Sequence, residues 1–415
     1  MSTTAAAAAF TVVPRHVLGG QGYTAPSDKL NIAYIGCGTQ GIREMCELIK
    51  NEEVQITSVC DPNKFSTDYV DWSLNGIRNM VRRTIEDPEW GSGLDGIPGG
   101  RDVGQELVEK YYALKSGKGA YSGCSSYNDY RELLEKETDI DAVIVSAYVS
   151  VAAEYVVLAL KAGKHVFCEK PPSMTTEQML QVVEAEKESG KILKYGFNHR
   201  FHYSVMEAKK IVDEGSLGKL LWMRGIYGKA GSIDYHDNWR NYKNYSGGGI
   251  LMDQGIHMLD LFRYFSNSEF ECLSSYMSSS YWKVECEDNA FLTLKSSDNI
   301  LATLHSSATQ WRHKFLLEMT FEDGYLNLDG ILSSTRSYAP ETLISGLREF
   351  EDVTFAIGKP KESITYFESD KSWSMELSEF INAIRGVNEI VNGTSNDAVE
   401  IMKLTDSIYK MAVKF

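Results

Sequence analysis

Gly36-Cys37-Gly38-Thr39-Gln40-Gly41 is the stretch of this 415-residue chain that decides the fold of its N-terminal part. It follows the apolar run 32–35 and precedes a helix-like segment. In a dinucleotide-binding βαβ unit, the first glycine allows a tight turn, the second lets the backbone approach a pyrophosphate, and the third lets the helix pack on the strand. The helix N-terminus, here Thr39 and Gln40, faces the anion. A glycine turn in another kind of α/β protein is the plainer alternative.

Asp61 extends this pattern, because it lies about 20 positions beyond Gly41, at the end of a second apolar strand, 54–60. A carboxylate at this point can accept hydrogen bonds from a ribose diol and repels a 2′-phosphate. The sequence therefore predicts that the cofactor is NAD rather than NADP.

The composition argues against several classes of partner. The chain has 42 basic and 57 acidic residues and a net charge of −15, a repulsive background for nucleic acid or an anionic membrane. Its seven cysteines are scattered, without a CxxC pair or metal-ligand spacing. We expect neither a disulfide framework nor a metal site.

The N-terminal segment, residues 1–28, has two interpretations. Its alanine run, short apolar stretch and polar Pro14-Arg15-His16 are similar to a twin-arginine export signal that lacks its arginine pair, which predicts a periplasmic protein. The alternative is an Ala-rich flexible tail on a cytoplasmic protein. The run is too short to span a membrane.

The expected fold class is α/β, with two domains. In residues 29–197, strand-like runs at 31–36, 55–60, 142–147, 165–168 and 192–197 alternate with helical patterns, which predicts a Rossmann domain with a doubly wound parallel sheet. The glycine-rich segment 68–123 interrupts this alternation of strands and helices. We therefore interpret it as an insertion near the nucleotide site that serves as a lid or an oligomer contact.

Residues 198–415 have a different pattern of apolar and polar residues. Alternating segments at 220–227, 272–282, 289–296, 300–306 and 315–321, with turn signals at Asp298-Asn299 and Asp323-Gly324, predict an open, largely antiparallel sheet. Helices are expected at 373–385 and 396–411. This second domain is predicted to be α+β and to bind the substrate.

Three ionisable residues occur in the apolar, helix-like segment 247–260. Asp253, His257 and Asp260 recur at helical spacing, so they share one face. Burying such a stripe is costly unless its members pair with one another or with a ligand, which indicates a working site. The plainer alternative is that Asp253 caps the helix and His257 is a core histidine.

Lys170 belongs to Glu169-Lys170-Pro171, which follows the predicted strand 165–168. Ligands of doubly wound sheets bind outside the carboxyl ends of the strands, so Lys170 is expected at the site. Neighbouring positive charge is expected to lower its pKa. Taken alone, a Lys-Pro step is usually an ordinary loop.

These motifs together give the chain its resemblance to the Gfo/Idh/MocA family of oxidoreductases, named for glucose-fructose oxidoreductase and inositol dehydrogenase. The resemblance covers nearly everything from Asn31 onward, and its motifs are the loop 36–41, Ala162-Gly163-Lys164-His165-Val166, Cys168-Glu169-Lys170-Pro171, Gly196-Phe197-Asn198-His199-Arg200, Trp239-Arg240 and the segment 249–260. It implies a catalytic lysine, aspartate and histidine, which carry over to Lys170, Asp253 and His257. Glu169 is expected to contact the cofactor, and the open sheet to support a homodimer or homotetramer.

The chain departs from the family pattern in two places. Family members commonly have a Thr-Pro step and a histidine where this chain reads Ala147-Tyr148-Val149-Ser150, so Tyr148 is expected to take that place. The segment 68–123 is also longer than the compact family core.

The leading hypothesis is oxidation of a secondary alcohol on a sugar, glycoside or cyclic polyol. In it, His257 accepts the hydroxyl proton, Lys170 positions the oxygen, and Asp253 orients the substrate and supports the imidazole. An indole covers the apolar face of a pyranose, so Trp239 is expected in the substrate pocket. The other residues expected to bind substrate are Arg200, His236 and Arg240.

Two other functions are considered; the same residues would serve the first, whereas the presence of Lys170, Asp253 and His257 argues against the second. A glycosidase that retains NAD would oxidise a ring hydroxyl transiently, eliminate the aglycone and then reduce the intermediate. A nucleotide-sensing protein would bind NAD without chemistry. Net reduction of NAD by a sugar distinguishes the dehydrogenase from both.

Overall fold

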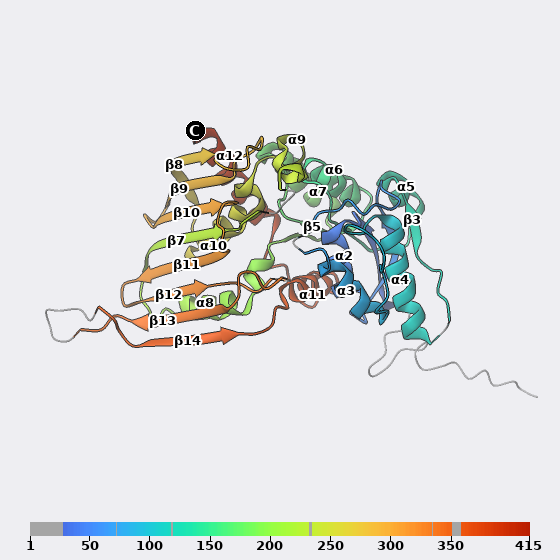
Figure 1. Ribbon diagram of the computed structural model, residues 1–415, viewed down its shortest axis with the longest axis horizontal. Coiled ribbons are helices and arrows are strands. Elements are labelled where there is room, and N and C mark those ends of the chain that lie inside the picture. Colours follow the sequence, from blue (N-terminus) through green and yellow to red (C-terminus); the bar gives the residue numbers. More distant parts are fainter. Residues whose placement is uncertain (1–27, 72, 118, 232–234, 334, 351–357) are drawn as a thin grey trace, which may run out of the picture.

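The computed structural model describes residues 28–71, 73–117, 119–231, 235–333, 335–350 and 358–415 (Figure 1). Its first sheet has six parallel strands in the order β3-β2-β1-β4-β5-β6, the strand order of a dinucleotide-binding doubly wound fold. The strands are β1 (Leu30–Ile35), β2 (Val54–Cys60), β3 (Ser125–Tyr127), β4 (Ala142–Val145), β5 (His165–Glu169) and β6 (Leu193–Gly196). The predicted Rossmann sheet is confirmed.

Helices cover both faces of this sheet, which is why its strands are apolar throughout. In β4 all four residues are buried, and alternate residues belong to two different core clusters. The covering helices are α2 (Thr39–Leu48), α3 (Gly76–Ile85), α4 (Arg101–Ser116), α5 (Tyr130–Lys136), α6 (Val149–Lys161) and α7 (Thr176–Ser189). Helix α11 (Ser372–Ile384) returns from the C-terminal part of the chain and packs Leu377, Phe380 and Ile381 into the cluster that contains α2 and α4.

The second sheet has nine strands in the order β14-β13-β12-β11-β7-β10-β9-β8-β15. The pairs β7–β10 and β15–β8 are parallel, and the other six pairs are antiparallel, so the predicted open and largely antiparallel sheet is confirmed. The strands are β7 (Leu220–Gly228), β8 (Phe270–Ser278), β9 (Asn289–Ser296), β10 (Leu301–Ser307), β11 (Lys314–Phe321), β12 (Gly324–Asp329), β13 (Glu341–Leu347), β14 (Glu362–Phe367) and β15 (Val413–Lys414).

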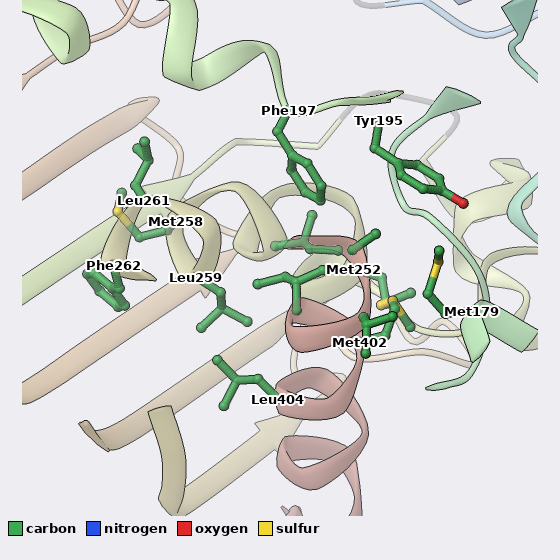
Figure 2. Close-up of a cluster of buried hydrophobic side chains, with 14 of the residues drawn as sticks. Met179, Tyr195, Phe197, Met252, Met258, Leu259, Leu261, Phe262, Met402 and Leu404 are labelled. Atoms are coloured by element: carbon green, nitrogen blue, oxygen red, sulfur yellow. The ribbon is translucent and has the colours of Figure 1, made fainter. Parts of the chain in front are cut away.

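Helices α8 (Tyr203–Glu214), α10 (Ile256–Ser266) and α12 (Ser395–Met411) lie on the face of the second sheet that is turned toward the first domain (Figure 1). Figure 2 shows the resulting core, in which Met402 and Leu404 of α12 meet side chains of α10 and, from the first domain, Met179 and Tyr195. The two domains therefore share one hydrophobic cluster, which fixes the position of any site between them.

The opposite face of the second sheet is open. The strand register places six apolar side chains on this face, each at least 41 % exposed: Trp222, Tyr276, Phe291, Leu301, Ile364 and Tyr366.

Several elements differ from the sequence-based expectation. Strands β3, β12, β13 and β14 were not expected, and β8 ends at Ser278 rather than near residue 282. Residues 1–27 of the predicted arm or export-signal remnant lie outside the described residues. Within the described ranges, no helix combines the length and apolar character needed to cross a membrane.

Candidate functional site

A cavity of about 630 Å³ lies beyond the carboxyl ends of the first sheet and is bounded by residues of both domains. Small-molecule sites typically have volumes of about 300–1,000 Å³. Predicted site residues that line it are Gly36, Gly38, Thr39, Gln40, Asp61, Glu169, Lys170, Trp239, Arg240, Asp253 and His257. The fold therefore brings most of the predicted site together, although these residues are up to 221 positions apart in the sequence.

The glycine loop forms one wall. Gly36 has a φ of +101°, and a Cβ on it would lie 2.3 Å from the carbonyl oxygen of Ser146. A Cβ on Gly41 would lie 2.1 Å from the carbonyl oxygen of Gly36, so helix and strand can approach only without it. Helix α2 begins at Thr39, and its N-cap, Gly38, has no side chain to cap the first N–H groups. An uncapped helix N-terminus in a cavity wall fits the pyrophosphate of a dinucleotide.

Asp61 holds this loop from the end of β2. One carboxylate oxygen accepts a hydrogen bond from the backbone N–H of Cys37 and the other from that of Asn63, both at 2.8 Å. The residue lines the cavity although it is only 6 % exposed, and burial raises its pKa. Carboxylate oxygens accept more than one hydrogen bond, so Asp61 retains acceptor capacity for a ribose.

The segment after β2 lies directly on the glycine loop. We call residues 62–71 and 96–100 the clasp, because two backbone bridges join them to each other. The backbone N–H of Gly100 donates to the carbonyl oxygen of Cys37 at 2.8 Å. The ring of Tyr69 packs against Gly38, the second glycine of the loop. A Cβ on Gly38 would lie 3.1 Å from this ring.

Helix α2 is also tied to the clasp. The hydroxyl of Thr39 donates to the carbonyl oxygen of Val70 at 3.0 Å. Arg43 and Asp71 form an ion pair at 2.8 Å, with side chains 5 % and 2 % exposed. The structure thus places the start of the predicted insertion at the glycine loop, whereas α3 and α4 pack against the sheet.

Gln40 connects the loop to two acidic residues. Its side-chain amide donates to Glu169 and to Glu44, each at 2.9 Å. Burial, and then the charge of Glu169, raises the pKa of Glu44 well above its ordinary value. Burial therefore favours the protonated form of Glu44 beside Glu169, which lies in the cavity wall.

Lys170 lies just past the end of β5. Its ammonium nitrogen donates to the backbone carbonyl oxygen of Asp253 at 2.8 Å and lies 3.9 Å from the nearer carboxylate oxygen of that residue. Burial lowers the pKa of Lys170, while Asp253 and Glu169 act in the opposite direction. An ammonium group has three donors, so Lys170 retains N–H groups for a bound substrate.

The carboxylate of Asp253 is surrounded by donors. Arg240 donates from Nε to Oδ1 at 3.1 Å, and the ammonium of Lys229 donates to Oδ2, to which the amide of Gln254 adds a contact at 3.3 Å. Burial acts to raise the pKa of Asp253, but Lys229, Arg240 and Lys170 outweigh it and hold that pKa far below its ordinary value. Asp253 is therefore ionised and is no general base.

The segment before His257 is not a regular α-helix. Residues Leu251–Gly255 form a π-helical turn, η5, and α10 begins at Ile256. Turns of this kind occur frequently at functional sites. Gly249 allows the chain to enter the turn, since a Cβ on it would lie 2.1 Å from the carbonyl oxygen of Glu287.

His257 lines the cavity in the neutral form. Its ring stacks on that of His199, with centroids 3.7 Å apart, and its Nδ1 has no hydrogen-bond partner among the described residues. Burial and then the charge of Lys170 lower the pKa of His257 well below its ordinary value. Among the described residues, the oxygens of Asp253 accept hydrogen bonds from Lys229 and Arg240, so the support of this imidazole by Asp253 stays a prediction.

Two predicted substrate residues lie outside the cavity wall. Arg200 is 5 % exposed and bonds Asp260 at 2.8 Å and Asp397 at 3.0 Å, so it ties α10 to α12. Asp260, the third member of the predicted stripe, serves this ion-pair network instead of a ligand. His236 has a side chain that is 60 % exposed and lies 3.2 Å from Asp237. The interpretation of Arg200 and His236 as pocket residues is therefore corrected.

Aromatic side chains border the cavity near Arg240. The guanidinium of Arg240 lies 4.4 Å from the centre of the Trp239 ring, and the ring of Tyr148 lies 4.6 Å from that of Trp239. All three residues line the cavity. Tyr148 thus lies at the position where the sequence lacks the expected histidine.

Sequence reasoning assigned no role to three residues around the site, which are Lys229, His199 and Tyr227. Lys229 follows β7, and only its place at a strand end could have indicated it. His199 was in a quoted motif but had no assigned role, and its Nε2 lies 2.9 Å from the hydroxyl of Tyr227. In the described ranges, no cluster of three or more His, Cys, Asp or Glu residues is arranged to hold a metal ion.

Comparison with known proteins gives two family matches. The profile described as "Oxidoreductase family, NAD-binding Rossmann fold" matches residues 113–197, and "GFO/IDH/MocA C-terminal domain" matches residues 205–327. Levoglucosan dehydrogenase of Pseudarthrobacter phenanthrenivorans is 33 % identical over 37 % of this chain and 40 % of that protein. Inositol 2-dehydrogenase of Salmonella typhimurium is 26 % identical over 54 % and 66 %, and myo-inositol 2-dehydrogenase of Thermotoga maritima 36 % over 35 % and 42 %. The chain thus spans 40 to 66 % of the length of these three relatives.

Solved structures share the fold at low sequence identity. Aldose-aldose oxidoreductase from Caulobacter crescentus has a TM-score of 0.67 at 21 % identity, over 92 % of this chain and 97 % of that one. The 3-ketoreductase KijD10 from Actinomadura kijaniata, in complex with NADP, has a TM-score of 0.67 at 16 % identity, over 93 % and 99 %. The WlbA dehydrogenase from Bordetella pertussis, in complex with NADH, has a TM-score of 0.65 at 15 % identity, over 92 % and 96 %.

Proposed function

Because the chain belongs to the Gfo/Idh/MocA family of oxidoreductases, we propose that it oxidises a secondary alcohol of a sugar, glycoside or cyclic polyol with a bound nicotinamide dinucleotide. One observation carries this proposal. Lys170 comes from the end of β5, while His257 and the Asp253 that orients Lys170 come from the segment 247–260, and all three line one cavity with the glycine loop.

The residues at the glycine loop fit the cofactor. The backbone at Gly36 and Gly38 and the uncapped start of α2 at Thr39 and Gln40 would hold its pyrophosphate, and Asp61 would hold the adenosine ribose. A dinucleotide held by these residues would supply the hydride acceptor for the oxidation of the carbinol carbon. NAD is the proposed cofactor, because a carboxyl group at Asp61 accepts hydrogen bonds from a ribose diol and disfavours a 2′-phosphate.

The cavity supplies a donor and an acceptor for the hydroxyl group. Lys170 donates a hydrogen bond to the reacting oxygen and stabilises its developing negative charge. His257 accepts the hydroxyl proton, since its imidazole is neutral and the residue lines the cavity. Asp253 contributes through its backbone carbonyl, which holds Lys170 in place.

The aromatic border supports a carbohydrate substrate. Trp239 and Tyr148 offer ring faces to the apolar side of a sugar, and Arg240 offers guanidinium N–H groups to its hydroxyls. The names of the relatives, which include sugar and inositol dehydrogenases, agree with this substrate class.

The test is reduction of nucleotide by the purified protein with a panel of sugars, glycosides and cyclitols. Formation of reduced nicotinamide in proportion to the oxidised sugar is the expected result. Cleavage of a chromogenic glycoside without net reduction would contradict the proposal, as would nucleotide binding without any turnover across the panel.

Cofactor preference is tested with Asp61→Ala. Loss of the carboxylate should weaken NAD binding and also reduce discrimination against NADP, because the repulsion of a 2′-phosphate disappears. Calorimetric titration of both nucleotides measures this. An unchanged ratio of the two dissociation constants would show that Asp61 does not contact the ribose.

A further inference from the structure

Lys229 lies directly behind the candidate catalytic residues without lining the cavity. It follows the last residue of β7, a central strand that pairs with β10 and β11. Its N–H donates to the carbonyl oxygen of Ser307 at 2.8 Å, and its own carbonyl oxygen accepts from Gln310 at 3.0 Å. Since only 1 % of the residue is exposed, the sheet fixes its position.

The side chain of Lys229 ends at Asp253. Its ammonium donates to Oδ2, and the ring of Tyr235 lies 5.6 Å from the nitrogen. A lysine is almost never fully buried without a partner for its charge, and here the Asp253 carboxylate is one such partner. Burial lowers the pKa of Lys229 to about 8, although Asp253 acts in the opposite direction.

This arrangement determines which atom of Asp253 accepts a hydrogen bond from Lys170. Lys229 takes Oδ2 and Arg240 takes Oδ1, so both carboxylate oxygens have closer donors than Lys170. Lys170 instead bonds the backbone carbonyl at 2.8 Å and stays 3.9 Å from the carboxylate. A direct ion pair would occupy the donors of Lys170 and raise its pKa.

We propose that Lys229 is a positioning residue for the oxidation: it keeps the Asp253 carboxylate away from Lys170, so that Lys170 can donate to the substrate oxygen. Lys229 acts through Asp253 and touches neither substrate nor cofactor. The inference rests on the proposed function, because it concerns the same reaction.

The charged and titratable neighbours of the two lysines define what a pH measurement reports. Around Lys229 they include Asp253, Arg240, Lys170, Tyr235 and His313. Around Lys170 they are Asp253, Glu169, Arg240 and the neutral imidazoles of His199 and His257.

The first experiment replaces Lys229 by methionine, which keeps the length of the side chain without its charge. We expect Lys229→Met to lower kcat about tenfold or more, because Lys170 then pairs with the Asp253 carboxylate instead of donating to the reacting oxygen. The dinucleotide affinity should stay within severalfold. The alkaline limb of the kcat profile should move to higher pH, since Asp253 now pairs with Lys170. Lys229→Arg should restore most of kcat.

A double-mutant cycle separates this role from a purely structural one. If Lys229 acts through Asp253, Lys229→Met combined with Asp253→Asn should be no slower than Asp253→Asn alone. The matched control is Lys164→Met, a lysine 8 % exposed that bonds the backbone carbonyls of Thr138 and Ile140 outside the cavity. This control should leave kcat and its pH profile unchanged. Additive losses in the cycle, or parental kcat and alkaline limb in Lys229→Met, would overturn the proposal.

The second experiment does not depend on turnover. Lysines labelled at Cε are titrated by NMR in the cofactor-free protein, and the signal of Lys170 is assigned by its loss in Lys170→Arg. The pKa of Lys170 should be higher in Lys229→Met than in the parent; an equal pKa would overturn the inference even if the parent oxidises sugars. If the parent reduces no nucleotide with any sugar, the proposed function fails while this titration still tests the coupling. Should Lys229→Met not fold, Lys229→Gln is measured in the same way.

Discussion

Lys170 and His257 present opposite protonation states to the same cavity. Both are buried, and burial disfavours the charged form of each. Asp253 and Glu169 partly offset this effect at Lys170, whereas the charge of Lys170 adds to it at His257. The site therefore contains a donor for a developing alkoxide beside an acceptor for its proton.

Replacement of Lys170 by alanine tests the donor. Lys170→Ala should reduce turnover by at least about 10²-fold, because a donor to the reacting oxygen is lost. The lysine side chain is not expected to hold the dinucleotide, so its affinity should stay within severalfold. Steady-state kinetics and calorimetric titration measure the two quantities. Parental turnover in this variant would remove Lys170 from the mechanism.

The pH profile of kcat tests both protonation states. The pKa of His257 lies well below 6.5, so His257 remains a proton acceptor there and activity should fall only at more acidic pH. The pKa of Lys170 lies below 10.5, so activity should decline on the alkaline side before that value, as the ammonium loses its proton. An acid limb centred near pH 6.5 would indicate an ordinary exposed histidine and contradict the assignment of His257.

Individual residues were predictable from the sequence where backbone sterics alone decide their role. Gly36 and Gly41 are examples, since a Cβ on either would meet a carbonyl oxygen. Arg200 was misassigned because one of its partners, Asp397, is 197 positions away in the chain and nothing local indicates the pair. Lys229 was missed for the same reason, as its role depends on Asp253 in another segment.

At the level of elements, the clasp is the segment that lies directly on the glycine loop. It covers the glycine loop through hydrogen bonds to Cys37 and Thr39 and through the buried ion pair of Arg43 with Asp71. Displacement of the clasp would open the loop, so its contacts are expected to slow the release of a bound dinucleotide.

Asp71→Asn should therefore speed dinucleotide release severalfold, because a buried ion pair loses one charge and leaves the other unpaired. Stopped-flow displacement of the reduced cofactor, followed by fluorescence, measures the release rate. Asp87→Asn, which removes an exposed ion pair with Lys110, is the control and should leave the rate unchanged. Equal release rates in both variants and the parent would show that the clasp has no role in retention.

The elements that the sequence predicted are those with one clear periodicity. Strands of the first sheet are continuous apolar runs, and β9, β10 and β11 alternate between buried and exposed residues. Strand β14 has no buried residue and so lacks this signal, and β3 is only three residues long. The π-helical turn η5 was not predictable, because the sequence 247–260 also fits the spacing of an ordinary helix.

At the scale of the whole molecule, the open face of the second sheet favours self-association. Apolar side chains gathered on one face of a sheet mark an interaction surface, and a second copy of the chain presents the same surface. We therefore expect a homodimer or a homotetramer. Phe291→Glu, which places a charge on this face in β9, should reduce the mass measured by light scattering. A parental protein that is monomeric at all concentrations would contradict the expectation.

The central claim is that Lys170 and His257 meet the reactive edge of a nicotinamide in the cavity between the two domains. A crystal structure of the protein with NAD and an unreactive deoxy-sugar tests it most directly. The account predicts a pyrophosphate at the start of α2 and a nicotinamide ring at the Lys170 end of the cavity, with its C4 about 3–3.5 Å from the sugar carbon. A nicotinamide ring outside this cavity, or a sugar beyond the reach of both Lys170 and His257, would contradict it.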